Sequence, residues 1–406
     1  MARVGDSTSI GQRPLSGLRV LDLSRVFAGP VAGRVLSDLG AEVVKVEPPE
    51  GDVTRLWGRK RGGVSTYFLQ QNCGKENICI DLRSEGGPRL IAELASAADV
   101  VIENFRPGVM AKYGLDWAAL SADHPELVML SISGFGQEGP ESHRAAYAGV
   151  IHAETGLVDQ NTDYWPVDVT FSAADVLSGM HGVVAVLAAL RMRDLTGVGQ
   201  HIDLAMTDAM VFSNDKVIDS LDGVHREPMG GEIWQTAGGK ITLVGGLRWI
   251  WHQLSNGYGL VDPTPADADL EVKLASRRAI ITEFLCSLPD REAVLAALDN
   301  VNLAWGELRE LRSVLESPTI QHRQTVAVVD DREGGTREVV RTPYRMSGAD
   351  TSDVGIPAFR GEHNGRVLEQ WLGADQTSIQ QLVTDGVILA DEWTLGTAEP
   401  TRRRSQ

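Results

Sequence analysis

The first half of the chain repeats a pattern of short apolar strand, helix and strand, and this pattern restricts the fold more than any other feature. A strand over residues 17–24 is followed by Pro30, which suits the first turn of a helix, and Gly40 ends that helix before a strand over 41–46. Parallel strands need such a crossover, so the unit predicts a parallel sheet. Further strands are expected over 77–81, 99–103, 127–133 and 201–204, with helices over 85–97 and 175–193. The predicted fold class is α/β, with an open, doubly wound large domain.

The segment after residue 215 does not continue this alternation. It contains a short strand over 241–244, helices over 279–287, 291–298 and 305–315, and a hairpin over 325–341. We therefore expect a large domain over 1–215, a smaller α+β domain over 225–340, and a C-terminal segment over 345–406 that returns to the large domain. Residues 1–13 are expected to form a loose arm and residues 398–406 to be disordered.

Composition and motif content argue against several classes of function. The formal net charge of −17 argues against nucleic acid or an anionic membrane as partner. We find no uninterrupted apolar run near the ~18–20 residues of a membrane span. The three cysteines form no C-x-x-C pair, the nine histidines lack metal-ligand spacing, and no G-x-S-x-G motif occurs. The spacing of the cysteines and histidines therefore predicts no metal site. Since the N-terminus lacks the pattern of a secretory signal, we expect a cytoplasmic protein.

One carboxylate, Asp175, stands at the head of a helix that is otherwise apolar nearly all round, within residues 170–190. Such a helix is expected to be buried. In one interpretation the acid is structural, because Ser172 and Asp175 have the spacing of a capping box with Ser172 as N-cap. In the other it is a working group, held ionised by the helix dipole and stripped of water by apolar surroundings. Gly179 and Gly182 would then leave room for another backbone or a ligand.

Two further signals lie near the ends of predicted strands. Arg25 and Arg106 each follow a strand, at the sheet edge where ligands of open α/β sheets bind, although a single basic residue is usually a solvated charge. The run Gly134-Phe-Gly-Gln-Glu-Gly139 matches the dinucleotide-binding fingerprint. That fingerprint must open a helix, whereas here Pro140 and a polar stretch follow, which favours a loop.

Three tryptophans, Trp234, Trp249 and Trp251, cluster in the predicted small domain. Core packing explains them better than an aromatic substrate pocket does. A role for these residues and Arg248 in substrate selection stays open.

A more specific signal comes from five segments taken in order. They are residues 17–30 (GLRVLDLSRVFAGP), 39–48 (LGAEVVKVEP), 99–108 (DVVIENFRPG), 133–140 (SGFGQEGP) and 199–204 (GQHIDL). Together they closely resemble the class III CoA-transferase family, which includes formyl-CoA transferase, carnitine CoA-transferase and the α-methylacyl-CoA racemases. The resemblance covers essentially the whole chain, down to Gly361-Glu-His363, and is loose only in the predicted small domain.

The resemblance implies an interlocked homodimer, with each chain threaded through a ring made by the other. It implies acyl-CoA and a carboxylic acid as substrates, no permanently bound cofactor, and Asp175 as the nucleophile that attacks the thioester. The residues it implies for contact with coenzyme A are Arg25, Val26, Phe27, Ala28, Ile80, Arg83, Asn104, Phe105, Arg106, Lys112, Ala145 and Tyr147. A glycine loop that shields the intermediate corresponds to Gly230 and Gly231.

Two departures from the family pattern bear on the reaction. Phe27 stands where formyl-CoA transferase has a glutamine, which weakens the case for formate and oxalate as the acid pair. Tyr147 and Ala148 stand where the racemases have a His-Asp pair, and tyrosine, with a pKa of about 10, is a poor base near neutral pH. CoA transfer is therefore favoured over an acyl-CoA racemase or epimerase that uses Asp175 as acid and base. It is also favoured over a CoA-binding protein without catalysis.

Overall fold

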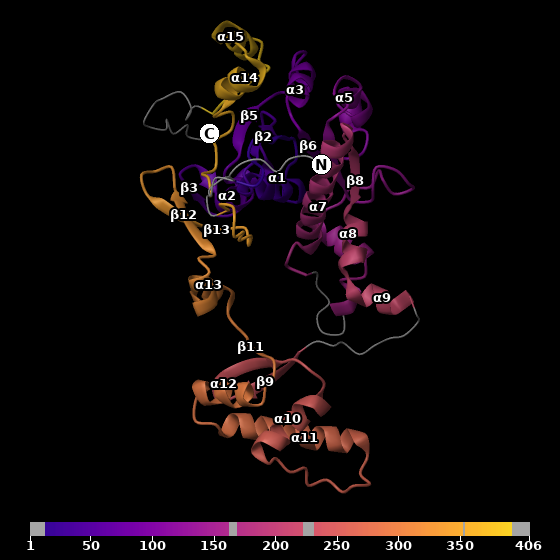
Figure 1. Ribbon diagram of the computed structural model, residues 1–406, viewed down its shortest axis with the longest axis vertical. Helices are drawn as coiled ribbons and strands as arrows, with labels where there is room; N and C mark the ends of the chain where they lie inside the picture. The colour runs from indigo at the N-terminus through magenta and orange to yellow at the C-terminus, as the bar shows by residue number, and fades with distance from the viewer. Residues whose placement is uncertain (1–12, 162–168, 222–230, 352–353, 392–406) are drawn as a thin grey trace, which may run out of the picture. The chain divides into compact units, whose positions relative to one another are not determined.

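The computed structural model describes residues 13–161, 169–221, 231–351 and 354–391 (Figure 1). The chain divides into a large unit, Met1–Asp215 with Gln324–Gln406, and a small unit, Lys216–Arg323. The predicted arm, residues 1–13, lies outside the described residues except for Arg13, and the predicted tail, residues 398–406, lies wholly outside them.

The large unit is built on a six-stranded parallel sheet with the strand order β5-β2-β1-β6-β7-β8. The strands are β1 (Arg19–Asp22), β2 (Glu42–Glu47), β5 (Glu76–Cys79), β6 (Val100–Glu103), β7 (Val128–Ser133) and β8 (His201–Ala205). The chain moves outward from β1 through β2 to β5 and then returns to place β6 on the other side of β1. The sheet therefore reverses its order between β1 and β6, and the predicted doubly wound α/β fold is confirmed.

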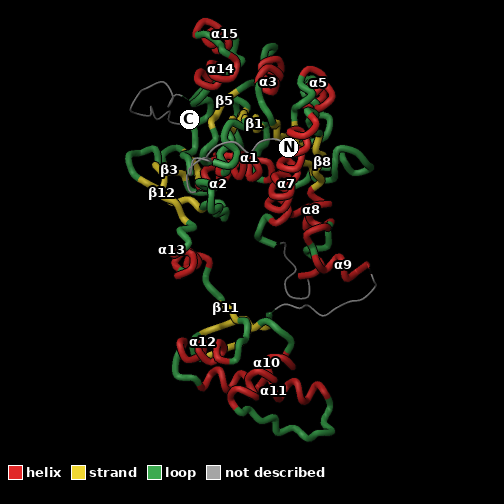
Figure 2. The backbone as a smooth tube through the Cα atoms, viewed as in Figure 1, coloured by secondary structure: helices red, strands yellow, loops and turns green. Residues whose placement is uncertain are grey.

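Helices cover both faces of this sheet (Figures 1 and 2). One face packs against α1 (Ala28–Asp38), α7 (Ala173–Thr196) and α8 (Met206–Ser213). The other packs against α3 (Gly87–Ser96), α5 (Trp117–Asp123), α14 (Asn364–Leu372) and α15 (Gln376–Thr384). Successive strand residues, such as Val100 and Val101, alternate between these two apolar clusters because strand side chains point to opposite faces.

Shorter elements complete the large unit. They are η1 (Val53–Leu56), β3 (Lys60–Arg61), β4 (Val64–Ser65), α2 (Thr66–Asn72), α4 (Val109–Lys112), α6 (Ala148–Glu154) and η2 (Asp159–Asn161). The hairpin of β12 (Val326–Asp330) and β13 (Thr336–Val340) forms as expected, but it belongs to this unit and not to the predicted small domain over 225–340. The reason is packing, since its Val329 and Val339 share an apolar cluster with Phe68 of α2.

Helix α7 is only partly buried, which corrects the expectation of a fully buried apolar helix. Val183, Val186 and Leu190 enter the core, whereas Val184 and Leu195 are exposed. Among the described residues α7 is also the one helix long and apolar enough to cross a membrane, judged by length and composition alone. Half of its most apolar stretch is packed inside the large unit, as in the core helix of a globular protein.

The small unit contains a three-stranded antiparallel sheet, β9 (Glu232–Thr236), β10 (Gly239–Leu243) and β11 (Trp305–Glu307), packed by α10 (Leu247–Tyr258), α11 (Leu270–Ser287) and α12 (Arg291–Asn300). Two short helices, η3 (Leu311–Glu316) and α13 (Pro318–His322), follow, and α9 (Asp215–Leu221) precedes the sheet. Trp234 is buried and Trp251 packs against the core, but Trp249 is exposed, so core packing explains only two of the three tryptophans.

The helix predicted over residues 305–315 is wrong in its first part, and only the short η3 is helical in this range. Trp305 instead pairs with Leu243, which supplies β10 with a second antiparallel neighbour. Leu308 and Leu311 are exposed. The edge of β10 satisfies its backbone hydrogen bonds through this pairing, and that tertiary demand overrides the local helical pattern.

Candidate active site

The loops after β1 and β6 meet at the point where the sheet reverses its order. The Arg25 backbone N–H donates to Asn104 Oδ1 at 2.8 Å, and Asn104 Nδ2 donates to the Arg25 carbonyl at 2.8 Å. Open α/β sheets bind their ligands in the crevice at this position. Arg25 and Asn104, which come from separate segments and are both predicted to contact coenzyme A, are therefore hydrogen-bonded to each other at the sheet edge where a ligand is expected.

The turn after β1 is held by a buried ion pair. Val26 has φ +70°, a left-handed conformation that is unfavourable for a β-branched residue. Its N–H donates to the Asp52 carboxylate, and Lys45 Nζ lies 3.1 Å from the same carboxylate and donates to the Ser24 carbonyl at 2.7 Å. Burial alone would raise the pKa of Asp52, but the Lys45 charge and hydrogen bonds from Thr54 outweigh it and lower that pKa. The ion pair thus fixes a strained turn.

Helix α1 begins directly after that turn, and its N-terminus lies beside Asp175. The Ala28 backbone N–H, at the start of α1, donates a hydrogen bond to the Asp175 carboxylate. The two helices approach closely because Gly179 faces the Ala28 carbonyl, where an added Cβ would lie only 2.7 Å from that oxygen. The expectation that Gly179 makes room for another backbone is therefore confirmed. The positive end of the α1 dipole also favours a carboxylate there.

Asp175 combines partial burial with this stabilisation. Burial raises its pKa to about 6, against the Ala28 N–H and nearby His152, which lower it. His152 Nε2 accepts a hydrogen bond from the Ala174 N–H at 3.2 Å, which places the ring beside the first turn of α7. A carboxylate of this kind is ionised at pH 7 yet poorly solvated, which suits a nucleophile.

The predicted capping box is only half correct. Ser172 is the N-cap residue of α7, but its side chain makes no capping hydrogen bond. It is instead hydrogen-bonded to the Tyr67 hydroxyl, and burial together with the Asp175 charge raises the pKa of Tyr67. Tyr67 packs edge-on against Phe27 at 5.6 Å and against Trp57 at 5.2 Å between ring centroids. An aromatic wall therefore adjoins Asp175, and Phe27, predicted to contact coenzyme A, belongs to it.

Two cavities contain most of the predicted site residues. A cavity of about 130 Å³ is lined by Asp175, Arg25, Val26, Ala28, Asn104, Phe105, Arg106, Ala145 and Tyr147, among others. A neighbouring cavity of about 540 Å³ shares Arg25, Val26, Phe105 and Tyr147 with it and adds Ile80 and Arg83. The larger one can take an extended ligand whose reactive end reaches the smaller, where Asp175 lies.

Four predicted residues are not brought into these cavities, and one of them is Phe27, which lies in the aromatic wall and lines neither cavity. Lys112, at the end of α4, is exposed and lines neither of them. Gly231 directly precedes β9 in the small unit, where an added Cβ would meet Thr242, and Gly230 lies outside the described residues. Among the described residues, no group of three or more His, Cys, Asp and Glu side chains could hold a metal ion.

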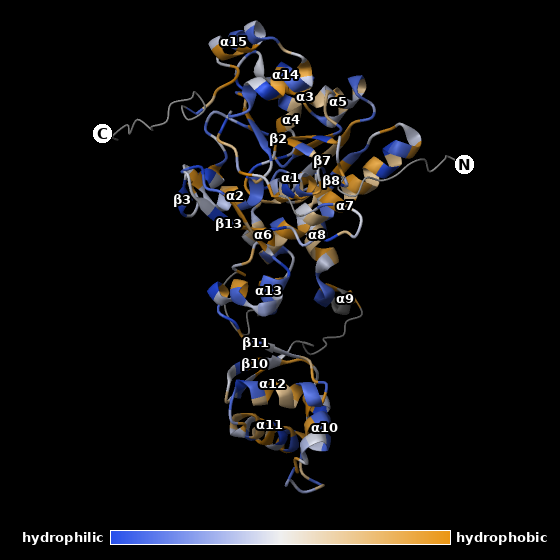
Figure 3. Cartoon of the chain, turned by 60° about the vertical axis from the view of Figure 1, so that its left-hand side comes forward, coloured by the Kyte–Doolittle hydropathy of each residue, from blue (hydrophilic) through white to orange (hydrophobic). Residues whose placement is uncertain are grey.

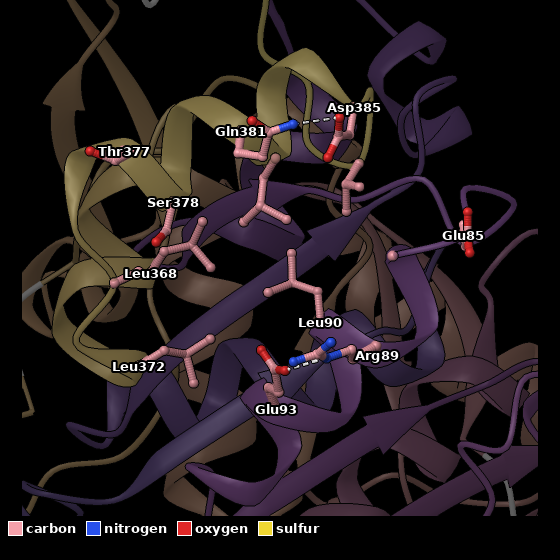
Figure 4. Close-up of a pocket in the computed structure, with 14 residues that line it drawn as sticks. Glu85, Arg89, Leu90, Glu93, Leu368, Leu372, Thr377, Ser378, Gln381 and Asp385 are labelled. Atoms are coloured by element: carbon pink, nitrogen blue, oxygen red, sulfur yellow. Dashed lines mark hydrogen bonds and ion pairs between the residues drawn. The ribbon is translucent and has the colours of Figure 1, made fainter.

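Two other features bear on the sequence expectations, a further cavity and the glycine run after β7. A cavity of about 1130 Å³ lies between α3 and helices α14 and α15, with Leu90, Leu368 and Leu372 in its walls (Figure 4). Its facing polar groups are already paired within their own helices, Arg89 with Glu93 and Gln381 with Asp385. The glycine run after β7 opens no helix before α6, so the interpretation as a loop is confirmed.

Sequence reasoning missed several residues that adjoin Asp175. Tyr67 and Trp57 come from α2 and the loop before β3, which carry no strand-end signal. His152 is hidden in the short α6. Ser133 lines the cavity of Asp175, and its position as the last residue of β7 was a usable signal.

Comparison with known proteins defines the class of enzyme. The sequence profile of CoA-transferase family III matches residues 15–364. A succinate–glutarate CoA-transferase from Agrobacterium fabrum is 33% identical over 391 residues, covering 90% of this chain and 97% of its own length. A formyl-CoA:oxalate CoA-transferase from Streptomyces coelicolor is 31% identical, covering 93% of this chain and 99% of its own length.

The fold is matched as well. The crystal structure of a CaiB/BaiF family protein from Brucella suis gives a TM-score of 0.77 at 33% identity, over 89% of this chain and all of that one. Fold and sequence together define an enzyme that handles acyl-CoA thioesters. The chain belongs to CoA-transferase family III, and the resemblance drawn from the five segments is confirmed.

Proposed function

We propose that this enzyme moves CoA from an acyl-CoA donor to a carboxylic acid acceptor, with Asp175 as the covalent nucleophile. The observation that carries the proposal is the state of Asp175: a partly buried carboxylate held by the N-terminus of α1, in a cavity at the reversal point of the sheet. Membership of the family supports the reaction class.

The chemistry follows from a carboxylate nucleophile. Asp175 attacks the thioester carbonyl and expels the CoA thiolate, which leaves a mixed anhydride. The thiolate then attacks the aspartyl carbonyl, giving an aspartyl-CoA thioester and the free donor acid. The acceptor carboxylate attacks this thioester to form a second anhydride, and the thiolate completes the new acyl-CoA. Both intermediates react with water, so a partly dry site serves the reaction.

Two arginines are suited to bind the anionic substrates. Arg25 and Arg106 line the cavity of Asp175, and neither has an ion-pair partner among the described residues. Arg83 differs, since it lies 2.7 Å from Glu50 and 2.9 Å from Asp81. We assign the first two to phosphates of CoA or to the substrate acid, and Arg83 to a weaker contact.

The two similar enzymes named above act on succinate and glutarate or on formate and oxalate, so short dicarboxylic acids are the first acids to test. The experiment is a matrix of acyl-CoA donors and acids, followed by chromatography of the CoA esters. We expect a new acyl-CoA that requires both the donor and the acceptor acid. If the CoA esters stay unchanged across the matrix while acyl-CoA still binds, the protein is a CoA-binding module instead.

The racemase alternative is disfavoured by the geometry around Asp175. Tyr147 is 65% exposed, and the buried His152 has its Nε2 engaged by the Ala174 N–H. Neither side chain is placed as the second base that proton transfer between two faces requires. Exchange of the α-hydrogen of an acyl-CoA with solvent deuterium, in the absence of any acceptor acid, would establish a racemase.

The proposal includes a homodimer, supported by apolar side chains that α7 and α8 leave exposed; Figure 3 colours these helices by the hydropathy of their residues. Val184 and Leu195 of α7 are 63% and 67% exposed, and Phe212 of α8 is 78% exposed. Large apolar side chains that stay exposed on two packed helices are typical of a protein interface. The free thiols Cys73, Cys79 and Cys286 are also consistent with the expected cytoplasmic location.

A charged substitution on this face should break the dimer. We expect the double variant V184E/L195E to run as a monomer at micromolar concentration in light scattering, because two buried carboxylates oppose association. The control is V383E, on the exposed side of α15. A double variant with the wild-type mass would show that α7 faces solvent and not a second copy.

The pKa of Asp175 predicts the pH dependence of the reaction. The nucleophile must be ionised, and burial raises its pKa to about 6. We expect kcat/KM for acyl-CoA to fall about tenfold per pH unit below pH 6, because that parameter reports the free enzyme. Circular dichroism at each pH separates this effect from unfolding. An inflection near pH 4, the ordinary range of aspartate, would contradict the burial described here.

A further inference from the structure

A row of polar side chains crosses three neighbouring strands on the face of the sheet that α7 does not cover. In the strand register, Glu103 of β6 stands opposite Ser131 of β7, and Ser131 stands opposite Asp203 of β8. Val101 and Met129, two residues earlier on their strands, pack into the cluster under α3 and α5, and alternate residues of a strand share a face. None of the three members of this polar row lines either cavity of the candidate site.

Glu103 is a buried acid without a basic partner. Its residue is 3% exposed, and among the described residues no lysine, arginine or histidine forms an ion pair with it. Burial raises the pKa of Glu103 to about 7 against hydrogen bonds from Ser131 and the Phe105 N–H, with a smaller contribution from the Asp203 charge. Ser131 is itself bonded to His201 Nε2 at 3.0 Å. Burial of an acid without a cation costs free energy, and only its hydrogen bonds compensate that cost.

Each carboxylate of the polar row holds a loop that follows a strand. Glu103 Oε2 accepts a hydrogen bond from the Phe105 N–H at 2.8 Å, in the loop after β6. Both carboxylate oxygens of Asp203 lie 3.1 Å from the Gln137 nitrogen, whose N–H donates to them, in the loop after β7. These residues come from three of the five segments that resemble the family, residues 99–108, 133–140 and 199–204.

Both loops supply walls of the smaller cavity of the candidate site. Asn104 in the first loop lines that cavity and exchanges two hydrogen bonds with Arg25. Gly134 and Arg144 line it from the second loop, and the Arg144 guanidinium lies over the Phe135 ring, 4.5 Å from its centroid. Binding residues that are carried on loops need support of this kind to keep the geometry that holds a ligand.

We propose that Glu103, Ser131 and Asp203 are positioning residues that keep the two loops in the shape that binds acyl-CoA, an inference that rests on the proposed transferase function. The two carboxylates act through the backbone N–H groups of Phe105 and Gln137 and not by contact with the substrate, and Ser131 holds the Glu103 carboxylate in place. Because α7 and its nucleophile lie on the other face of the sheet, loss of the polar row should weaken CoA binding more than the chemical step.

The first test measures CoA binding by titration calorimetry. We expect the dissociation constant for CoA to rise about tenfold in E103A and in D203A, because each variant loses a hydrogen bond that fixes a loop. The kcat at saturating substrate should stay close to wild type. E103Q keeps an acceptor for the Phe105 N–H and should bind CoA as the wild type does. Because Asp203 is exposed, D203A should fold even if E103A does not.

The control for this test is D375A. Asp375 accepts the Ser378 N–H at 2.8 Å at the start of α15, which lines neither cavity of the candidate site. Loss of this helix cap should lower the melting temperature and leave the dissociation constant for CoA unchanged. The assignment is overturned by an unchanged dissociation constant in both E103A and D203A, by a fall in kcat without a change in CoA affinity, or by an E103Q that binds CoA as weakly as E103A.

The second test needs no ligand. Hydrogen–deuterium exchange followed by mass spectrometry should show faster exchange in the peptide that contains Phe105 for E103A, and in the peptide that contains Gln137 for D203A. D375A should change neither peptide. Unchanged exchange in both variants would overturn the role of the polar row. A wild-type enzyme that forms no new acyl-CoA would contradict the proposed function, and the exchange comparison would still decide whether the polar row holds the loops.

Discussion

Replacement of Asp175 by asparagine is expected to abolish CoA transfer and to stabilise the folded protein. Loss of the nucleophile should lower kcat by about 10⁴-fold or more. The pKa of Asp175 is raised from 3.8 to about 6 by burial, so the ionised group opposes folding at pH 7. Since each unit of pKa corresponds to about 1.4 kcal/mol, we expect D175N to gain about 1–3 kcal/mol in the free energy of unfolding.

The sign of this effect gives a second check. The folded protein binds a proton at Asp175 more tightly than the unfolded chain does. The advantage of D175N should therefore be full above pH 6 and disappear as the pH falls towards 4. The control is D175E, which keeps the charge and should not gain stability. Equal unfolding energies for D175N and wild type at pH 7 would show that Asp175 is well solvated.

Replacement of Asp52 by alanine is expected to be the most destabilising single change near the site. Asp52 and Lys45 are both 1% exposed at their side chains, and Asp52 also binds the strained Val26 N–H. Removing one partner leaves a buried charge unpaired, which typically costs about 3–5 kcal/mol. Urea unfolding of D52A measures this loss directly.

A matched control lies two residues away. Glu50 pairs with Arg83 at 2.7 Å, but its side chain is 61% exposed, so the unfolding free energy of E50A should stay close to that of wild type. If D52A also stays within about 1 kcal/mol of wild type, the turn after β1 does not depend on the buried pair. Acyl-CoA binding by D52A should weaken as well, because Val26 and Ala28 lose their support.

The sheet could be predicted from the sequence because its signals are local. Apolar runs, Pro30 and Gly40 each act within a few residues, and parallel pairing follows from the crossover helices. The segment over 305–315 could not be assigned in this way, since its structure depends on β10 needing a partner. Helix α7 was misjudged for a related reason, because composition alone does not show how much of an apolar surface stays uncovered.

The site was predictable only where function coincides with strand ends or a recognised segment. Asp175, Arg25 and Asn104 came from such positions, and the structure brings all three to one cavity. The Lys45–Asp52 pair was not predictable, since it is defined by burial and by a contact that the folded loops create. Gly230 and Gly231 stay a prediction.

The central claim is that Asp175 carries the transferred group. The most direct measurement is mass spectrometry of the enzyme after incubation with acyl-CoA and trapping with hydroxylamine. We predict a hydroxamate on the peptide that contains Asp175, formed only when acyl-CoA is present and absent from D175N. An unmodified peptide, together with turnover that persists when Asp175 is replaced by alanine, would contradict the mechanism.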